Sequence, residues 1–244
     1  MNIGYFGGTF DPIHNGHLAL ARAAFEACHL DRVLFVPTDA PPHKRRKPIS
    51  SFVHRYTMVA LALNEARERS FVPSLLEQPG PNVRFRYSID TIRALRRRLR
   101  KSDRLFFLIG IDAFLEISSW HQPEALLRAC EFVVVSRPGY SLPHVAEALP
   151  ASLRPQAGLD LGSRPGPPTR PDFGRGGVAR RRVTTLRLKG ATIHLVEGVK
   201  VPVSATHLRA ALRAGSSRSK QNWRKMLPAS VAAYIQKMHL YEKE

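Results

Sequence analysis

The sequence predicts an α/β fold built on a doubly wound parallel sheet with helices on both faces. Short apolar runs alternate along the chain with longer stretches of helical periodicity. This alternation is typical of parallel strands joined by right-handed crossovers. The first apolar run, residues 3–6, starts almost at the N-terminus and is followed by a glycine pair and an alanine-rich helical stretch.

The individual elements follow from the same patterns. We expect strands at residues 2–6, 32–36, 71–75, 105–109, 132–135 and 192–196. Helical patterns lie between them at residues 18–28, 52–67, 89–100 and 123–128. Two further helices, residues 205–214 and 229–238, predict a small C-terminal helical part within residues 204–240. The whole chain, residues 1–244, is thus predicted to be a single Rossmann-like domain.

One connection breaks the regular alternation. The stretch from residue 138 to residue 190 is much longer than a normal crossover. It is rich in proline and glycine, and arginines concentrate between Arg175 and Lys189. Such a composition can bury little surface. We therefore expect a flexible insertion at about residues 150–190.

Composition limits the possible partners and compartments. A chain of 244 residues can bury one sizeable core. Cys28 and Cys130 lie far apart in apolar segments, which predicts reduced thiols in a cytoplasmic protein. No charged segment followed by an apolar one opens the chain, and no apolar run approaches the roughly 18 residues of a membrane helix. We therefore expect no membrane partner.

The formal net charge of +19 raises the question of nucleic-acid binding. No aromatic residues are interleaved with the arginine clusters, although stacking on aromatic rings is the usual second component of single-strand binding. Excess positive charge also steers small anionic substrates. The sequence therefore predicts no specific nucleic-acid partner, and only nonspecific binding at low salt.

The most informative segment is GGTFDPIHNGHL, residues 7–18. It lies between the first strand and the first helix, where main-chain N–H groups and the positive helix end attract anions. Gly7 and Gly8 let a ligand approach the main chain, and His14 and His17 lie one helical turn apart on the same side. An ordinary turn or a metal-binding pair are the alternatives, but structural zinc requires four ligands. We expect a polyphosphate site and no metal site in the chain.

A second segment with similar chemistry lies near the other end of the chain, at residues 201–209, VPVSATHLR. Ser204 and Thr206 are N-cap candidates for the helix that follows, and Gly215 ends that helix. Arg209 in the first turns adds a cation suited to phosphate. The alternative is an ordinary capped surface helix.

Together the two segments resemble the nucleotidyltransferase superfamily. His14-Asn15-Gly16-His17 resembles its (T/H)xGH signature, and residues 201–209 are similar to its ISSTxIR motif, with Ala205 where a second serine is frequent. This resemblance implies ATP binding by residues of both motifs. They are Gly7, Gly8, Thr9, Phe10, His14, Gly16, His17, Ser204, Thr206 and Arg209.

Four middle segments make the chain similar to bacterial nicotinate-nucleotide adenylyltransferases. They are PPHK at 41–44, RYSIDT at 86–91, GIDAF at 110–114 through Trp120-His121, and SRPG at 136–139. The resemblance implies adenylyl transfer from ATP to nicotinate mononucleotide, a step of NAD biosynthesis that releases pyrophosphate. The alternative, phosphopantetheine adenylyltransferase, usually has Thr where His14 stands and lacks the Gly-x-Asp…Trp segment.

The resemblance also implies roles for the middle residues. Main-chain N–H groups at Tyr87 and Ser88 would hold the nicotinate carboxylate, and Trp120 would stack on the pyridine ring, although a tryptophan can equally be a core anchor. Gly110 and Asp112 follow a strand and would contact ATP, the carboxylate at its ribose. Lys44 would bind the triphosphate and, with Arg137, the mononucleotide.

Adenylyl transfer depends mainly on positioning and on neutralising phosphate oxygens. We expect His14, His17, Lys44 and Arg209 to be the catalytic residues. Mg²⁺ would arrive with ATP, because the sequence offers no dedicated carboxylate cage. A nucleotide-binding regulator without turnover and a basic nucleic-acid-binding module remain alternatives. Activity on the amidated mononucleotide and assembly into a homo-oligomer stay open.

Overall fold

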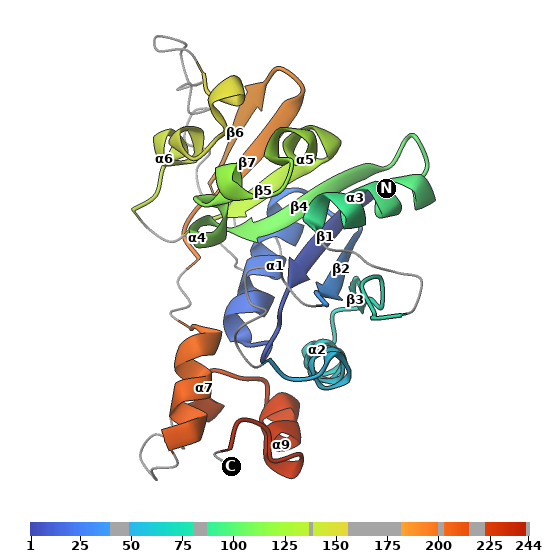
Figure 1. The fold of residues 1–244 in the computed structure, drawn as a ribbon, viewed down its shortest axis with the longest axis vertical. Helices are drawn as coiled ribbons and strands as arrows, with labels where there is room; N and C mark the ends of the chain where they lie inside the picture. The colour runs from blue at the N-terminus through green and yellow to red at the C-terminus, as the bar shows by residue number, and fades with distance from the viewer. Residues whose placement is uncertain are drawn as a thin grey trace, which may run out of the picture. The chain divides into compact units, whose positions relative to one another are not determined.

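The computed structural model of the chain describes residues 1–39, 49–80, 87–136, 139–155, 182–199, 203–214 and 223–242. These residues contain a seven-stranded sheet with the strand order β3-β2-β1-β4-β5-β7-β6 (Figure 1). The strands are β1 (Asn2–Gly8), β2 (Arg32–Pro37), β3 (Phe71–Pro73), β4 (Arg104–Gly110), β5 (Glu131–Val135), β6 (Val183–Leu188) and β7 (Ala191–Val196). The pairs β1–β4, β2–β3, β4–β5 and β5–β7 are parallel, and β6–β7 is antiparallel.

Helices separate the parallel strands along the chain. They are α1 (Asn15–Ala27), α2 (Phe52–Ala66), α3 (Ser88–Arg98), α4 (Ile111–Phe114), α5 (Pro123–Ala129), α6 (Leu142–Glu147), α7 (Ala205–Ala214) and α9 (Ala229–Lys237), with short 3₁₀ turns η2 (Ile117–Ser119) and η3 (Ala151–Leu153). The predicted Rossmann-like α/β class is confirmed, and each predicted strand and helix is present with its ends displaced by a few residues. Within the described residues, no helix is both long and apolar enough to cross a bilayer.

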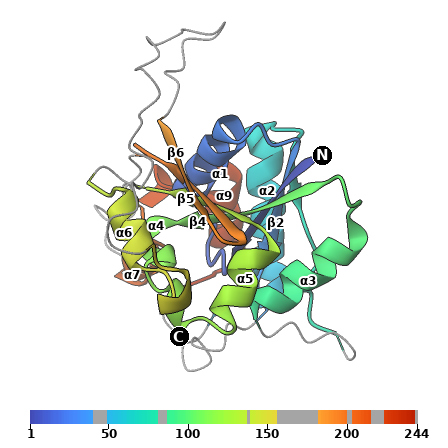
Figure 2. The ribbon, with the colours of Figure 1, turned by 90° about the horizontal axis from the view of Figure 1, so that it is seen from above.

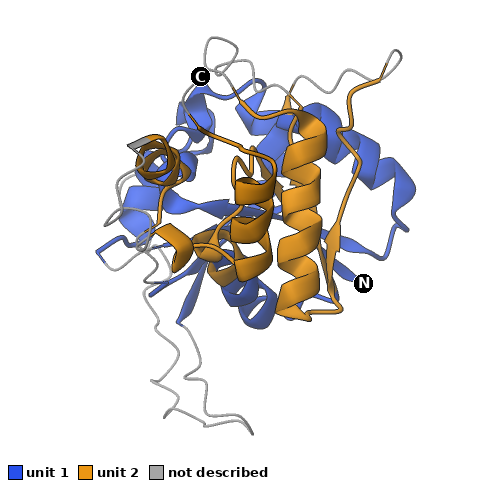
Figure 3. Cartoon of the chain, turned by 90° about the horizontal axis from the view of Figure 1, so that it is seen from below, with its two compact units in different colours: residues 1–5, 20–31, 88–200 blue, residues 6–19, 32–87, 201–244 orange. Residues whose placement is uncertain are grey.

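The chain divides into two compact units (Figure 3). Unit 1 comprises Met1–Tyr5, Leu20–Asp31 and Ser88–Lys200. Unit 2 comprises Phe6–Ala19, Arg32–Tyr87 and Val201–Glu244. The strand order reverses at β1, and in open α/β sheets ligands bind beyond the carboxyl ends of strands at such a reversal. The carboxyl end of β1 is Gly8, so this rule draws attention to the segment that follows it.

The core of unit 1 is formed by its parallel strands. Residues 105–109 of β4 and 132–135 of β5 are all buried, as expected for strands covered on both faces. The rings of Phe107 and Phe132 stack across this pair with centroids 4.9 Å apart and planes at 4°. Helices α3 and α5 pack against one another in the same unit (Figure 2).

Strand β6 corrects the sequence analysis, which placed residues 183–188 in a flexible insertion. It pairs antiparallel with β7 from Val183↔Val196 to Leu188↔Ala191. The sequence of β6, VTTLRL, shows little apolar alternation, and only Leu186 of this strand is buried. The two strands are joined through Lys189 and Gly190, and Gly190 adopts a φ of 83° that suits a glycine in a tight turn.

Part of the long connection from residue 138 to residue 190 also belongs to the core. Leu142 and Val145 of α6 are buried, as are Leu149 and Leu153 around η3. Neither element was predicted from the sequence, because each is shorter than two helical turns and shows little periodicity. Residues 156–181, the centre of the expected insertion, lie outside the described residues.

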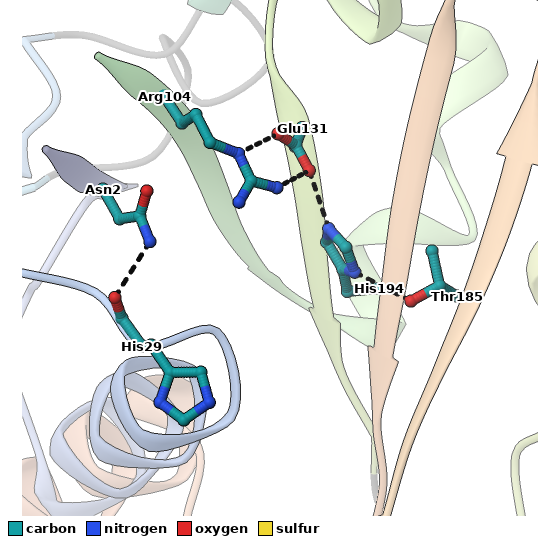
Figure 4. A network of polar contacts seen from close by, with 6 residues as sticks. All are labelled: Asn2, His29, Arg104, Glu131, Thr185 and His194. Atoms are coloured by element: carbon teal, nitrogen blue, oxygen red, sulfur yellow. Dashed lines mark hydrogen bonds and ion pairs between the residues drawn. The ribbon is translucent and has the colours of Figure 1, made fainter. Parts of the chain in front are cut away.

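A polar network crosses four neighbouring strands of unit 1 (Figure 4). Arg104 on β4 donates from Nε and Nη2 to the two carboxylate oxygens of Glu131 on β5, both at 2.8 Å. His194 Nε2 on β7 lies 2.9 Å from Glu131 Oε2, and its Nδ1 lies 3.0 Å from Thr185 Oγ1 on β6. Burial alone would raise the pKa of Glu131, but the hydrogen bonds from Arg104 and His194 outweigh it and lower that pKa. The network therefore links the antiparallel β6–β7 hairpin to the parallel strands.

Both cysteines are free thiols, as the sequence analysis expected. Cys130 is buried, and Cys28 is half-buried. Burial, assisted by the nearby Glu131 carboxylate, raises the pKa of Cys28 to about 11. Neither thiol has the lowered pKa of a reactive cysteine, because burial also raises the pKa of Cys130.

In unit 2, helix α9 packs against α2 and receives its N-terminal cap from it. The residue before α9 is Pro228, whose side chain accepts no hydrogen bond. Glu65 of α2 accepts instead, from Ala229 N at 2.9 Å and Ser230 N at 2.7 Å. Burial alone would raise the pKa of Glu65, but hydrogen bonds from Ser230 and Ala229 lower it overall.

The Glu65→Ala substitution should destabilise the docking of α9. Because two N-terminal N–H groups of α9 would lose their acceptor, the free energy of unfolding should fall by about 1 kcal/mol. Chemical denaturation followed by circular dichroism measures this change. Glu26→Ala, at an exposed position of α1, is the matched control and should leave stability nearly unchanged. Equal stability of the two variants would contradict the capping role.

Candidate active site

The segment between β1 and α1 differs in detail from the predicted glycine turn. Gly7 and Gly8 are the last residues of β1, and the turn runs through residues 9–14. A Cβ atom at Gly8 would lie 3.0–3.3 Å from three atoms of the Phe10 ring. Phe10 itself is 1% exposed, with its ring edge-on to those of Phe6 and His17. Gly8 is therefore required by the packing of Phe10, and any contact of Phe10 with ATP is left to its main chain.

His14 and His17 lie together at the start of α1. Their rings are stacked, with centroids 3.7 Å apart and planes at 22°. The main-chain N–H of His14 donates to His17 Nδ1 at 3.2 Å, and His17 N donates to the His14 carbonyl at 2.9 Å. The His17 side chain, at N3 of α1, thus caps the main-chain N–H of His14 at the N-cap, which is one half of a capping box, while the N–H of His17 bonds the His14 carbonyl rather than its side chain. Since Nδ1 of His17 accepts, a neutral His17 ring carries its proton on Nε2.

His14 is the more buried of the two rings. It is 6% exposed, and its Nδ1 is buried without a hydrogen-bond partner among the described residues. Burial lowers the pKa of His14 from 6.5 to about 4, so the ring is neutral at neutral pH. A buried, unpaired ring nitrogen beside a helix N-terminus is suited to an anionic ligand, which would supply both the missing partner and the compensating charge.

Asp11 was not singled out by the sequence analysis, yet three segments meet on it. Its carboxylate accepts from Tyr241 Oη at 2.6 Å and from Ser50 N at 3.3 Å. Its carbonyl accepts from Arg209 Nη1 at 2.6 Å. Burial, reinforced by the neighbouring Asp11 carboxylate, raises the pKa of Tyr241, which stays a protonated donor. Nothing in the sequence next to Asp11, between Phe10 and Pro12, indicates that its hydrogen-bond partners lie so far along the chain.

Arg55, also unforeseen, is buried in the first turn of α2. It is 1% exposed, and its guanidinium donates four hydrogen bonds to main-chain carbonyls. One of these carbonyls is that of Thr9, in the segment between β1 and α1. In the sequence Arg55 looks like an ordinary helix cation, because nothing local shows that it faces inward.

Asn15 ties the start of α1 to the C-terminal part of the chain. Its Nδ2 donates to the Lys225 carbonyl at 3.1 Å, and its main-chain N donates to the Met226 carbonyl at 3.0 Å. Asn15, which lies between His14 and Gly16 of the motif, therefore has a structural role in this unit.

The second predicted motif lies at the start of α7. Ser204 precedes the helix, and its carbonyl accepts from Leu208 N at 3.0 Å, so Ser204 occupies the N-cap position. Thr206 lies inside the first turn, and its prediction as an N-cap was wrong. Its Oγ1 accepts from Arg209 Nη2 at 3.5 Å. The structure thus brings Arg209 onto Asp11, within the segment that carries His14 and His17.

The predicted residues of unit 1 cluster near the carboxyl end of β4. Gly110 ends β4 and precedes α4, and Asp112 is exposed in that helix. Trp120 follows η2 half-buried, edge-on to Phe107 with centroids 6.1 Å apart. Trp120 is therefore partly a core anchor and partly accessible.

The remaining predicted residues are less fully described. Ser88 is the first residue of α3, and Tyr87 precedes it at 39% exposure. Lys44 and Arg137 lie outside the described residues. Among the residues that the structure describes, no group of three or more His, Cys, Asp or Glu side chains could hold a metal ion.

Comparison with known proteins shows the family to which the chain belongs. The Cytidylyltransferase-like family model matches residues 5–211. A probable nicotinate-nucleotide adenylyltransferase of Citrifermentans bemidjiense is 35% identical over 241 residues, which is 99% of this chain and 98% of that protein. The corresponding protein of Geobacter metallireducens is also 35% identical with the same coverage. The chain belongs to the nicotinate-nucleotide adenylyltransferase family.

Solved structures agree with this assignment at the level of the fold. The chain resembles the Plasmodium falciparum nicotinic acid mononucleotide adenylyltransferase, solved as a complex with NaAD, with a TM-score of 0.67. The two are 16% identical, and the match covers 98% of this chain and 97% of the other. A second structure of that protein, complexed with APC, matches equally well. The chain therefore shares its fold with a protein of very different sequence.

The lowered pKa of His14 predicts that the folded chain becomes less stable as the pH falls. The unfolded chain takes up a proton on this ring near pH 6.5, whereas the folded protein does so only near pH 4. Between these values the unfolded state binds more protons, so the free energy of unfolding should fall as the pH falls, by about 3 kcal/mol in total. Urea denaturation across this pH window measures the slope. His14→Gln should flatten it, and an unchanged slope in that variant would contradict the assignment.

Proposed function

We propose that the chain transfers the adenylyl group of ATP to nicotinate mononucleotide and releases pyrophosphate, as a step of NAD biosynthesis. The observation that carries this proposal is the stacked His14–His17 pair at the start of α1, in which the neutral His14 ring has a buried Nδ1 with no hydrogen-bond partner among the described residues. Family membership and the names of the relatives support the substrates.

The chemistry requires positioning and charge neutralisation. A phosphate oxygen of the mononucleotide attacks the α-phosphorus of ATP in line, the bond from that phosphorus to the bridging oxygen breaks, and pyrophosphate leaves. In the proposed mechanism His14 contacts the α-phosphate, and the proximity of the anion raises the pKa of its ring. His17 directs its Nε2–H to the developing charge, because its Nδ1 is already held by the His14 main chain.

Arg209 is the proposed partner of the β- and γ-phosphates. Its bond to the Asp11 carbonyl uses one donor of Nη1 and orients the guanidinium, which leaves further N–H groups for phosphate oxygens. Ser204 and Thr206 at the start of α7 add hydroxyl donors, and Gly7, Gly8, Thr9, Phe10 and Gly16 line the ATP side of the motif. Lys44 is proposed to contact the triphosphate and the mononucleotide.

A divalent metal accompanies ATP in this proposal, and we propose Mg²⁺. Such an ion would supply neutralisation of the charge that concentrates on the leaving pyrophosphate. The chain's own groups suit this arrangement, because histidine, arginine and hydroxyl donors contact phosphate rather than the metal itself.

The nicotinate and ribose contacts form the remaining part of the proposal. Main-chain N–H groups at Tyr87 and Ser88 would hold the nicotinate carboxylate, and the accessible part of Trp120 would stack on the ring. Arg137 would contact the mononucleotide phosphate. Gly110 and Asp112, beyond the carboxyl end of β4, would contact the ATP ribose. We also propose a cytoplasmic location, which suits two free thiols, and no specific nucleic-acid partner.

Removal of the His17 ring should slow the chemical step. If its Nε2–H stabilises the transition state, His17→Ala should lower kcat by a factor on the order of 10²–10³. Pyrophosphate release from ATP and nicotinate mononucleotide measures the effect, with circular dichroism as a check on folding. His29→Asn, at an exposed position where asparagine tolerates the left-handed φ of 47°, is the control and should turn over normally. Wild-type turnover in His17→Ala would remove the role proposed for it.

The site should also prefer the acid over the amide. Loss of a charge-assisted contact to the nicotinate carboxylate costs about 1–3 kcal/mol, so kcat/KM should be roughly 10- to 100-fold lower with nicotinamide mononucleotide. The same assay with each mononucleotide in turn gives the ratio. Equal rates would contradict the assignment of Tyr87 and Ser88, and rapid turnover of phosphopantetheine would assign the chain to the alternative reaction.

A further inference from the structure

Arg55 is the largest side chain that is fully buried in the described residues. Its Nε donates to the Ser50 carbonyl at 3.0 Å, and its Nη2 donates to the Asp39 carbonyl at 3.0 Å. Its Nη1 donates to the carbonyls of Thr9 at 2.9 Å and Thr38 at 2.7 Å. The four carbonyls, which we call the carbonyl cluster, engage all three nitrogens of the planar guanidinium.

The carbonyl cluster joins three separate segments of unit 2. Thr9 follows β1, Thr38 and Asp39 follow β2, and Ser50 precedes α2. Further bonds lock the same peptides, since Thr38 N donates to the Gly8 carbonyl at 2.9 Å and Ser50 N donates to Asp11. Arg55 thus fixes the main chain just beyond the carboxyl ends of β1 and β2, where ligands of α/β sheets bind.

Stability alone does not explain a cation at this position. A buried charge loses its hydration, and well-packed apolar replacements of buried ion pairs are frequently neutral or stabilising. Burial lowers the pKa of Arg55, although Asp11, Asp39, Tyr241 and Glu77 act in the opposite direction. The shape of the guanidinium is the distinguishing property, because its donors are arranged in a rigid plane and reach acceptors on several sides.

A lysine could not replace this arrangement. Its ammonium has three donors around one point, so at least one of the four carbonyls would lose its partner. The peptides would then be free to rotate by small amounts. A displacement of about 1 Å in a catalytic group can cost about 100-fold in rate. The segment after Thr9 leads directly to His14 and His17, so such a displacement would reach the proposed catalytic pair.

We propose that Arg55 is a positioning residue for adenylyl transfer, which orients the segment between β1 and α1 through the carbonyl cluster. This inference rests on the function proposed above. Arg55 touches no substrate in this role; it acts through the main chain that carries His14 and His17. Its loss should therefore reduce kcat more than it changes the KM for nicotinate mononucleotide.

The first experiment compares Arg55→Lys with Arg67→Lys, the same substitution at the exposed C-cap residue that follows α2. Arg55→Lys should lower kcat about 10- to 100-fold, with the KM for nicotinate mononucleotide within about threefold of wild type. Arg67→Lys should behave as wild type. Assays well below the melting temperature of each variant separate positioning from unfolding. Wild-type kcat in Arg55→Lys would overturn the proposal.

The second experiment uses chemical rescue. In Arg55→Ala, guanidinium ion at concentrations far below those that denature the protein should restore part of kcat, whereas equal concentrations of sodium ion should not. If Arg55 only stabilised the fold, activity would be lost and restored together with the melting temperature. Recovery of the melting temperature without recovery of kcat would also overturn the proposal.

Amide hydrogen exchange tests the cluster without any activity assay. The amides of Thr38 and Ser50 should exchange faster in Arg55→Lys than in wild type, and at wild-type rates in Arg67→Lys. Faster exchange with unchanged kcat would limit Arg55 to folding and refute its positioning role. If wild-type protein released no pyrophosphate from ATP and nicotinate mononucleotide, the proposed function would fail, while the exchange rates would still report whether Arg55 holds these peptides.

Discussion

The hydrogen bonds of the Arg55 guanidinium hold the main chain of unit 2 where β1 and β2 end. Just beyond β1 and β2, the main-chain carbonyls of half-buried residues have left the sheet ladder and face the buried Arg55 side chain. Buried carbonyls must find donors, and a single arginine supplies them to Thr9, Thr38, Asp39 and Ser50. The start of α1, with its stacked histidines, continues from one of these fixed peptides. A point charge such as ammonium cannot provide the same planar set of donors.

The C-terminal part of the chain completes the same segment from a great distance in sequence. Arg209 binds the Asp11 carbonyl, Tyr241 binds the Asp11 carboxylate, and Asn15 binds the carbonyls of Lys225 and Met226. Helix α9 is in turn anchored through Glu65 of α2. The segment between β1 and α1 is therefore held by contacts with residues far away in the sequence.

The electrostatic character of the site is set by burial more than by the high net charge. Among the described residues that contribute to the formal charge of +19, the arginines of α3 are exposed. In the segment between β1 and α1, burial keeps the His14 ring neutral. The cation next to this segment, Arg209, already donates a hydrogen bond to the Asp11 carbonyl. An incoming triphosphate would therefore find oriented donors and one titratable ring whose charge depends on the ligand.

Local signals in the amino-acid sequence were enough to predict the α/β class, the parallel strands and the strand–turn–helix context of residues 7–18. These follow from continuous apolar runs such as residues 132–135 and from the local order of strand, turn and helix, all of which are short-range signals. Gly7, Gly8, His14, His17 and Arg209 could be singled out because they lie in recognisable motifs. The remaining candidate residues depended on resemblance, and their contacts with substrates are still proposals.

The way in which the motif is held became visible only in the folded chain. Arg55 and Asp11 are common residue types without a local pattern, and their importance arises from partners up to 230 residues away, as in the Tyr241–Asp11 bond. Strand β6 was missed for a related reason: its sequence shows little apolar alternation, and its place in the sheet comes from pairing with β7. Apolar periodicity in the sequence shows which face of a helix or strand is buried. Long-range polar contacts depend instead on which main-chain groups still lack hydrogen-bond partners once the chain has folded.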